Sequence, residues 1–435
     1  MKFSVANIFH FKQQALRWAS TFNVSSYLDN NNHQQSSFDC LIASGIKTEL
    51  ISNENSFEQL KEFFEKEKSW LCGFMTYDLK NQIEKLKSEN PDGIGMPGMY
   101  FFKPEILIRI SSPFSSGEGS GVRRNAEIEI TAADPANVFA QINSFSIREN
   151  SSTTLPIKVN HRISKDDYLK KVACIREHII EGDVYELNLC QEFFAENCDI
   201  EPLQVFEKLN SATQNPFACF LKLKDKFLIC SSPERFLKKE GSKLISQPIK
   251  GTIRRGKNEQ EDDQLKNELH HSEKEQAENV MIVDLVRNDL ARSCKPGSVK
   301  VEELFGVHSF RNVHHLISTL SGELRNEVHF VDAIKNAFPM GSMTGAPKIK
   351  AMELIEHYEE TKRGLFSGSV GYITPEGDFD FNVVIRSILY NQSKKYLSFQ
   401  TGGAIVYDSV PEKEYEETML KAGAMLKALS VTKSD

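Results

Sequence analysis

Pro248-Ile249-Lys250-Gly251-Thr252 is the stretch of this 435-residue chain that decides how the rest is interpreted, because it places a primary amine in an otherwise uncharged turn. An amine attacks only when it is unprotonated, and burial or a nearby cation can lower the pKa of a lysine enough for that. Lys250 is therefore a candidate nucleophile. Taken alone, the stretch better fits a solvent-exposed lysine at the end of a strand, because exposed lysines far outnumber catalytic ones.

An acidic residue lies a short distance upstream. The apolar run Phe227 to Cys230 predicts a strand, and Glu234 follows its end. A second short strand, Lys243 to Ile249, then leads into Lys250. If a turn joins two adjacent strands here, the carboxylate and the amine lie close together, as acid–base chemistry requires. The alternative for Glu234 is a surface salt bridge with its neighbour Arg235.

Two pairs of glutamates occur at helical spacing. Glu275 and Glu278 stand three residues apart at the start of a predicted helix, and Glu414 and Glu417 repeat the arrangement near the C-terminus. Facing helices that carry such pairs could hold Mg²⁺, which binds one or two carboxylates together with water and substrate oxygens. The alternative needs no metal: Ser272 and Glu275 fit a capping box, and acidic residues in a first turn favour the helix dipole.

Two predicted strands carry further polar residues. Val184 to Phe194 alternates in polarity and places Glu186 on a face that could line a cleft. A predicted hairpin ends in the strand Phe379 to Tyr390, on which Asn382 and Arg386 are expected to point the same way. Arginine suits a carboxylate ligand, because its planar group donates two hydrogen bonds to one anion.

Four other segments predict turns or loops. Thr401-Gly402-Gly403-Ala404 is small enough for backbone N–H groups to approach an anion, although a tight turn or bulge explains the segment better when it is taken alone. The loop from Gly341 to Lys348 leads into a helix N-terminus, which favours anions, but it lacks the Gly-Lys-Ser/Thr of a P-loop. Lys257 to Glu278 predicts a solvated loop until a helix begins, and Ser111 to Arg124 predicts another loop.

Taken together, the motifs resemble the chorismate-utilising enzymes, a family that includes component I of anthranilate and aminodeoxychorismate synthases and the isochorismate and salicylate synthases. The resemblance covers about residues 155 to 430. Its segments occur in family order: Gly182-Asp183 with Asn188-Leu189, Ser232-Pro233-Glu234-Arg235, Pro248 to Thr252, Ala277 to Asp289, His315 to Thr319, Gly345 to Lys348, Arg386, and Glu414 to Thr418.

The residue between Pro-Ile and Gly-Thr separates the branches of this family. Aminodeoxychorismate synthases carry lysine there, as this chain does at Lys250, whereas anthranilate synthases carry alanine. The resemblance implies that Lys250 adds to C2 of chorismate while the 4-hydroxyl leaves with a proton from Glu234, and that ammonia then enters at C4 and expels the lysine. Anthranilate synthase activity and a catalytically silent chorismate-binding subunit are the alternatives.

The resemblance also implies a magnesium ion on the ring carboxylate. Glu278 and Glu417 match the direct ligands, and Glu275 and Glu414 match residues that hold its water molecules. The electrostatics agree, because a dianionic substrate and four carboxylates would repel one another without a cation.

The remaining matches concern substrate binding. By resemblance, the enolpyruvyl carboxylate is bound by Arg386 and by the backbone of Gly402, Gly403 and Ala404, whereas His315, Thr252 and Glu186 lie near the ring. Glu186 stands where the amino-transferring branches usually have glutamine and the isochorismate and salicylate branches have lysine. The missing lysine argues against water as the nucleophile, but the role of Glu186 is open between accepting a proton from ammonium and pairing with a neighbour. Asp39 to Ser44 lacks the Leu-Leu-Glu-Ser segment of tryptophan-regulated relatives, so inhibition by tryptophan is not expected.

Composition sets wider limits. The net charge of -7 and pI near 6.0 provide no basic surface for nucleic acid. Eight cysteines without C-x-x-C spacing favour reduced thiols over disulfides or zinc. No apolar run approaches the length of a membrane span and no secretory segment is evident, so we expect a cytoplasmic protein without membrane contact.

The expected fold also follows from the resemblance. It is α+β, with large mixed or antiparallel sheets stacked between helices and two pseudo-repeated halves that enclose the site in a cleft. Residues 1–150 would form an N-terminal region that helps to face an amidotransferase, and residues 155–430 the chorismate-binding catalytic region. Free ammonia is scarce at neutral pH, so a glutamine amidotransferase subunit is the expected source. These 435 residues show no glutaminase Cys-His-Glu set, and we expect that activity on a separate chain.

Overall fold

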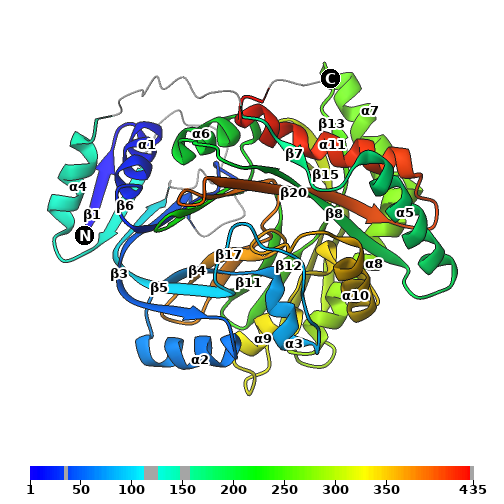
Figure 1. The fold of residues 1–435 in the computed structure, drawn as a ribbon. Coiled ribbons are helices and arrows are strands. Elements are labelled where there is room, and N and C mark those ends of the chain that lie inside the picture. Colours follow the sequence, from blue (N-terminus) through cyan, green and yellow to red (C-terminus); the bar gives the residue numbers. More distant parts are fainter. Residues whose placement is uncertain (34–37, 112–125, 147–156, 432–435) are drawn as a thin grey trace.

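The strands of this protein join into one branched antiparallel sheet, seen in a computed structural model that describes residues 1–33, 38–111, 126–146 and 157–431. Two long strands, β3 (Cys40–Ser52) and β5 (Met99–Ser111), pair over almost their whole length and form the point of branching. Two arms of sheet extend from them, with helices on the outer sides (Figure 1). The predicted α+β class, with large sheets stacked between helices, is confirmed.

The first arm runs from β1 to β8. In order of pairing it contains β1 (Lys2–Val5), β6 (Ala126–Thr131), β5, β3, β2 (Val24–Asp29), β9 (Phe217–Leu223), β10 (Lys226–Ser232), β19 (Ser387–Asn391), β20 (Tyr396–Ile405) and β8 (Glu186–Ala195), which also pairs with β7 (Asn160–His161) and β16 (Gly345–Ala346).

The second arm starts where β4 pairs with the other end of β5. It contains β4 (Leu71–Met75), β17 (Ser369–Ile373), β18 (Phe379–Asn382), β11 (Arg235–Glu240), β12 (Lys243–Gln247) and β15 (Val313–Glu323), with β13 (Ile249–Arg254) and β14 (Lys300–Ser309) also paired to β15. Lys250 thus lies at the far end of the second arm, and Glu186 at the far end of the first.

Helices cover the outer faces of both arms. They are α1 (Ile8–Ala19), α2 (Ser56–Glu67), α3 (Lys80–Ile83), α4 (Pro135–Ser144), α5 (Lys165–Ile180), α6 (Pro202–Thr213), α7 (Glu259–His270), α8 (Glu273–Ala291), α9 (Phe330–Ala337), α10 (Lys348–Tyr358) and α11 (Pro411–Ala428), with 3₁₀ turns at Tyr77–Leu79 and Gly341–Met343. Several begin at a side-chain cap, because the oxygens of Asn7, Ser164 and Ser272 accept N–H bonds from the first turn.

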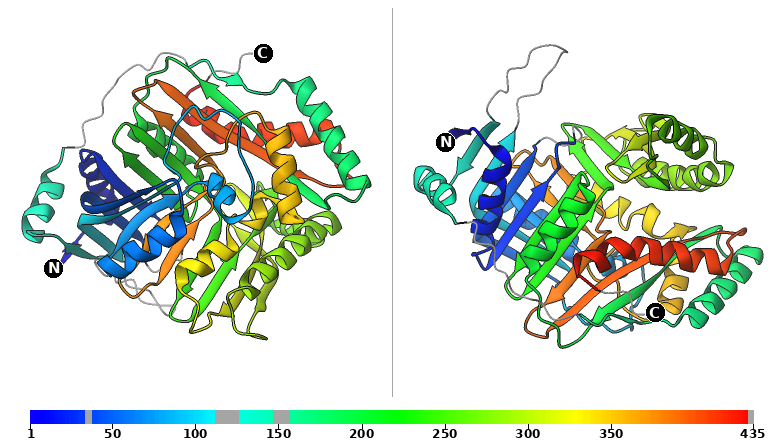
Figure 2. Two further views of the ribbon diagram at one scale, coloured as in Figure 1. Left: turned by 60° about the horizontal axis from the view of Figure 1, so that its bottom comes forward. Right: turned by 90° about the horizontal axis from the view of Figure 1, so that it is seen from above.

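The hydrophobic core follows these layers. One cluster, which includes Leu41, Phe74 and Leu221, fills the space between the two arms. A second cluster packs α1, α6 and α11 on the outside of the first arm, and a third packs α2, α8 and α9 on the outside of the second. The blue and yellow helices α2 and α9 cover the face that is turned forward in the left view of Figure 2.

The chain crosses between the arms twice beside the predicted site. Glu234 lies on the crossing from β10 to β11, and Arg386 lies on the crossing from β18 to β19. The two crossings are joined by backbone hydrogen bonds from Val383 to Glu234 and from Ser231 to Arg386. The predicted single strand Phe379 to Tyr390 is therefore wrong: the hairpin of β17 and β18 is present, but the second strand breaks before Arg386, whose φ is +51°. Asn382 and Arg386 do not share a strand.

The segment from Lys257 to Glu278 also differs from the prediction. Instead of a solvated loop it contains helix α7, which begins after Asn258 because that side chain accepts the N–H of Glu261. The helix has few apolar residues, so its helical periodicity is hard to detect in the sequence.

Four further predictions concern a loop, the domain division, the cysteines and the lack of a membrane span. The predicted loop Ser111 to Arg124 lies, beyond Ser111, outside the described residues. The division near residue 150 stays a prediction, and its boundary falls largely among residues that are not described. The eight cysteines are all free thiols, as predicted. Across the described ranges, no helix combines the length and the apolar character that crossing a membrane would require.

Candidate active site

Lys250 and Glu186 form a buried ion pair where the far ends of the two arms meet. Nζ of Lys250 lies 2.5 Å from Oε1 of Glu186, and the exposed fractions of the two side chains are 9% and 0%. The alternative of a solvent-exposed lysine is therefore wrong. The second carboxylate oxygen of Glu186, Oε2, is buried and has no hydrogen-bond partner among the described residues.

The protonation of Lys250 differs from the sequence-based expectation. Burial acts to lower the pKa of this lysine, but the carboxylates of Glu186 and Glu278 outweigh it and raise the pKa above its ordinary value. The lysine is thus held as an ammonium ion at neutral pH. It must transfer a proton to another group before it can act as a nucleophile.

Glu234 lies close to Lys250, as the sequence predicts. β11 and β12 are adjacent antiparallel strands, so the residues at their ends, Glu234 and Pro248, come together. The carboxylate is buried and accepts hydrogen bonds from the Ser342 hydroxyl and the Ile249 N–H. Burial raises the pKa of Glu234 to about 7, against the smaller opposing effects of these bonds and of Lys250. A carboxyl group with that pKa can donate a proton near neutral pH.

The alternative of a salt bridge between Glu234 and its neighbour is wrong. The guanidinium of Arg235 is instead paired with Asp380, with Nε 2.9 Å from Oδ1 and Nη2 3.0 Å from Oδ2. This pair ties β11 to β18 and leaves the Glu234 carboxylate facing Ser342. Ser342 was missed as a site residue, although it belongs to the loop from Gly341 to Lys348 that the sequence marked as an anion-binding candidate.

The four predicted metal ligands lie at the N-terminal ends of α8 and α11. Ser272 caps α8 by accepting the N–H of Glu275, as one half of the predicted capping box requires. Burial raises the pKa of Glu278 to about 7 and also raises the pKa of Glu275 and of Glu414. Glu417 is more exposed and is paired with Lys421 at 2.6 Å.

The backbone of two glycines lies against these carboxylates. Gly251, next to Lys250, has φ +83°, and a Cβ on it would lie 2.9 Å from Oε2 of Glu275. A Cβ on Gly403 would lie 3.3 Å from Oε2 of Glu414 and 3.6 Å from Oε1 of Glu417. Glycine at both positions leaves the acidic groups room beside the site.

Mg²⁺ is the ion that the family resemblance implies for this acidic cluster. The donor set fits, because all four groups are carboxylates, the oxygen ligands that magnesium prefers, and three have pKa values raised by burial. In the part of the chain that the structure describes, no three of them bring oxygens within 4.8 Å of one another. Nζ of Lys421 forms an ion pair with Oε1 of Glu417, and Nζ of Lys274 lies 3.8 Å from Oε1 of Glu278.

His315 and Thr252 face each other across β13 and β15. The Thr252 hydroxyl oxygen lies 2.8 Å from Nδ1 of His315. Burial, and then Arg386, lower the pKa of His315 to about 3, so the ring is neutral at physiological pH. A neutral imidazole can offer one hydrogen bond without adding charge beside a substrate.

Arg386 carries a guanidinium for which the described residues provide no partner. It is partly buried, and neither a hydrogen bond nor an ion pair joins its side chain to any other described residue. Burial lowers its pKa, with Glu417 opposing, although an arginine remains charged at any physiological pH. A partly buried, unpaired guanidinium is suited to an anionic ligand.

Gly402, Gly403 and Ala404 lie in a regular strand. They pair with β8 opposite Cys190, Leu189 and Asn188 without a register shift, so the alternative of a tight turn or bulge is wrong. β20 pairs with β19 only at Tyr396 to Ser398, which leaves the edge from Gly402 onwards without a strand on that side in the described structure. The carbonyl of Gly402 accepts a hydrogen bond from Nζ of Lys421 at 2.8 Å.

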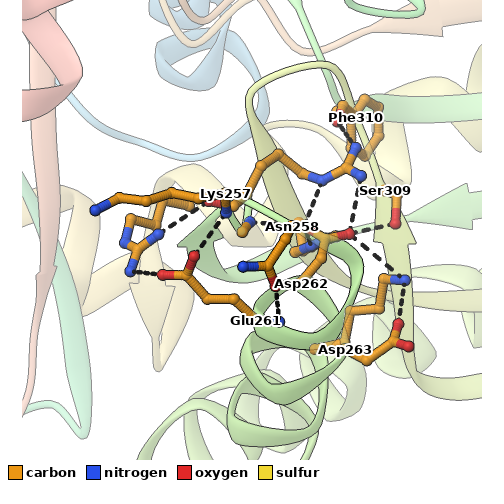
Figure 3. A network of polar contacts seen from close by, with 12 residues as sticks. Lys257, Asn258, Glu261, Asp262, Asp263, Ser309 and Phe310 are labelled. Carbon is orange, nitrogen blue, oxygen red and sulfur yellow. Dashed lines mark hydrogen bonds and ion pairs between the residues drawn. The ribbon is translucent and has the colours of Figure 1, made fainter.

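A polar network anchors the segment that follows Lys250. Figure 3 shows Asp262 of α7 at its centre. Its carboxylate accepts two bonds of 2.8 Å from Arg255 and one of 2.7 Å from the Gly256 N–H, and Oδ1 lies 2.9 Å from Nε2 of His314. Arg255 also donates to the carbonyl of Phe310. The network fixes the end of β13 to α7 and β15.

A second support was not predicted from the sequence. Glu359 and Arg363 form a buried ion pair of 2.6 Å. Arg363 also donates to the carbonyls of Asn188 and Met343, and Glu359 accepts the N–H of Cys190 at 2.9 Å. The pair therefore braces β8, which carries Glu186, against the loop that carries Ser342.

Comparison with known proteins agrees with this geometry. The sequence profile of the chorismate binding enzyme family matches residues 8–427. The chain belongs to this family. The family match extends into the N-terminal 150 residues, well beyond the 155–430 range on which the resemblance was recognised.

The proteins similar to this chain include aminodeoxychorismate synthases and anthranilate synthases, two branches of the family. Aminodeoxychorismate synthase component 1 of Bacillus subtilis strain 168 is 35% identical over 373 residues, 83% of this chain and 77% of its own length. A probable chloroplastic aminodeoxychorismate synthase of Oryza sativa subsp. japonica is 33% identical over 94% of this chain, which spans 50% of that relative. The crystal structure of anthranilate synthase component I from Streptococcus pneumoniae TIGR4 is 27% identical, with a TM-score of 0.76 over 91% of this chain and 93% of its own.

Proposed function

We propose that this protein is component I of an aminodeoxychorismate synthase, which converts chorismate and ammonia to 4-amino-4-deoxychorismate for the synthesis of para-aminobenzoate and folate. The observation that carries the proposal is the buried Lys250 in reach of a proton acceptor, Glu186, and near a proton donor, Glu234. The names of several relatives at 33–42% identity support the same branch.

The proposed reaction divides one difficult displacement into two. Lys250, as a free amine, forms a bond to C2 of the ring, the double bond shifts, and the 4-hydroxyl leaves as water with a proton from Glu234. Ammonia then attacks C4, the double bond shifts back, and the bond to C2 breaks so that its electron pair returns to the lysine nitrogen. The enolpyruvyl group is retained. Covalent catalysis of this kind replaces one difficult displacement of the hydroxyl group with two easier substitutions.

The acidic cluster would hold Mg²⁺ in this proposal. Glu278 and Glu417 are the proposed direct ligands, and Glu275 and Glu414 the residues that hold its water molecules. When bound, the ion would supply positive charge for the ring carboxylate of chorismate. Lys421 and Lys274 would then release the glutamates that they approach.

The substrate would be oriented by the groups around the cluster. Arg386 and the backbone of Gly402 to Ala404 are proposed for the enolpyruvyl carboxylate, because a guanidinium that no described residue pairs with can donate two hydrogen bonds to one carboxylate. The neutral His315, held by Thr252, is proposed for a polar contact near the ring.

Ammonia would come from a glutamine amidotransferase subunit, component II, because the free base is scarce at neutral pH. A cytoplasmic location remains a prediction. The alternative in the same family is anthranilate synthase component I, which the likeness to the S. pneumoniae structure keeps open. Lys250 argues against it, since anthranilate synthases resemble this chain but carry alanine there.

Product identification tests the proposal. The purified protein is incubated with chorismate, MgCl₂ and excess ammonium salt near pH 8, and the products are separated and identified by mass. Aminodeoxychorismate, with its enolpyruvyl group, is the expected product. Anthranilate with pyruvate would instead assign the chain to the other branch, and no turnover even with an amidotransferase subunit would indicate a silent chorismate-binding subunit.

A further inference from the structure

Glu186 carries a buried carboxylate of which only one oxygen is satisfied. Oε1 binds Nζ of Lys250, whereas Oε2 has no hydrogen-bond partner in any of the described segments, although the side chain is 0% exposed. A buried charged oxygen without a donor is costly, and such groups concentrate at functional sites.

The position of this carboxylate is fixed by the backbone. Glu186 opposes Ala346 of β16, and the next residues of β8 pair with β20. Tyr185 also donates its N–H to the carbonyl of Ala346. The carboxylate is therefore presented to Lys250 by a strand held on both edges.

The nucleophile needs a proton acceptor, and its hydrogen-bond partner is Glu186. The other carboxylates that act on Lys250 are Glu278 and Glu275 from α8, Glu417 from α11 and Glu234 from the crossing between the arms, and all four act through space without a hydrogen bond to Nζ in the described structure. Glu234 is assigned above as the proton donor to the leaving hydroxyl, and the other three to the metal site. Glu186 is the carboxylate left for this task.

We propose that Glu186 is the general base for Lys250: it takes the proton of the lysine ammonium when the C2–N bond forms, holds it while the lysine is bonded to the ring, and returns it when the lysine leaves. This inference rests on the proposed function, because it concerns the covalent step.

The protons balance over one cycle. Lys250 ammonium and Glu186 carboxylate become free amine and carboxylic acid, and the amine then bonds to C2. The hydroxyl leaves as water with the proton of Glu234, and an incoming ammonium ion restores that proton and becomes the ammonia that attacks C4. The lysine leaves as a free amine, and Glu186 protonates it. The net change is chorismate plus ammonium to aminodeoxychorismate, with a protonated amino group, plus water.

The test compares wild type with Glu186→Gln, which removes the base but keeps the size of the side chain. Rates at saturating chorismate and Mg²⁺ are measured from pH 6.5 to 9.5. The ratio of the two rates at each pH cancels the pH dependence of free ammonia, which both proteins share. We expect a loss of about 10²- to 10⁴-fold at pH 7, and a deficit that shrinks as hydroxide replaces the base.

A second readout separates a base from a simple ion-pair partner. Modification of Lys250 by an amine-directed acylating reagent, followed by mass spectrometry, reports the free amine. Loss of the Glu186 charge lowers the pKa of Lys250, so the variant should be labelled faster at pH 7 although its catalysis is slower. Glu186→Asp retains a carboxylate and should keep a wild-type pH profile at a reduced rate. Glu207→Gln, in the Arg17 ion pair on α6, is the matched control and should behave as wild type.

The outcomes are distinct. A rate ratio for Glu186→Gln that does not change with pH, or a variant as fast as wild type, would overturn this inference while leaving the proposed function in place. A wild-type protein that makes no aminodeoxychorismate would overturn the proposed function and this inference with it.

Discussion

Nζ of Lys250 on β13 lies 2.5 Å from Oε1 of Glu186 on β8, although the two strands belong to different arms of the sheet and are not paired with each other in the described structure. Each backbone position is fixed by its own arm, β13 by β15 and β8 by β16 and β20. The ion pair therefore depends on how the far ends of the two arms meet. Supports behind β8, such as the Glu359–Arg363 pair, therefore contribute to the geometry of the site.

The proton donor gives a prediction on pH. Because burial raises the pKa of Glu234 to about 7, its protonated form is complete well below pH 7 and is lost as the pH rises through 7. At a fixed concentration of free ammonia, the rate should fall by about tenfold per pH unit above that value. Glu234→Gln should lower the rate by about 10²- to 10⁴-fold and remove this alkaline decline. An unchanged decline in the variant would assign it to another group.

The acidic cluster gives a prediction on magnesium. Glu278→Gln should raise the Mg²⁺ concentration for half-maximal activity by at least about tenfold, because a neutral amide replaces a proposed direct ligand. Calorimetric titration with MgCl₂ alone provides a readout that does not require turnover. Asp284→Asn, an exposed residue of the same helix, is the control. Equal Mg²⁺ dependence in the two variants would exclude Glu278 from the metal site.

The unpaired guanidinium gives a prediction on substrate affinity. Arg386→Met should raise KM for chorismate by about 10- to 100-fold, since a charge-assisted hydrogen bond contributes about 1.5–3 kcal/mol. The thermal stability should change little, because the side chain has no partner to lose among the described residues. If KM is unchanged and stability falls, Arg386 has a structural role instead.

The brace behind β8 gives a prediction on stability. Arg363→Met leaves Glu359 buried without its cation and should lower the free energy of unfolding by about 3–5 kcal/mol, measured by urea denaturation. Arg17→Met breaks the more exposed pair with Glu207 and should lower it by about 1 kcal/mol or less. Similar small losses in both variants would contradict the role of the buried pair.

Local patterns identified the parts of the site that depend on neighbouring residues. Glu234 and Lys250 could be expected together because they flank one strand hairpin, and the glutamate pairs could be placed on helix starts by their spacing and by the Ser272 cap. Helix α7 was missed because its charged surface lacks an apolar stripe.

Contacts between distant segments could not be read in the same way. Glu186 and Lys250 are 64 residues apart and on different arms, so nothing in the sequence between them indicates the pair. The direction of the lysine pKa was consequently predicted wrongly, because it depends on how many carboxylates the fold gathers around the amine. The break before Arg386 likewise follows from the crossing between arms, which a run of apolar residues does not reveal.

The central claim is that Lys250 is the covalent nucleophile, and the rate of aminodeoxychorismate formation by Lys250→Ala tests it most directly. Lys250→Arg is the matched variant, because it keeps a cation for Glu186 but has a guanidinium that stays protonated and does not attack. With chorismate, MgCl₂ and excess ammonium salt, we predict that neither variant forms aminodeoxychorismate while wild type does. Formation of aminodeoxychorismate at the wild-type rate by Lys250→Ala would contradict the covalent mechanism.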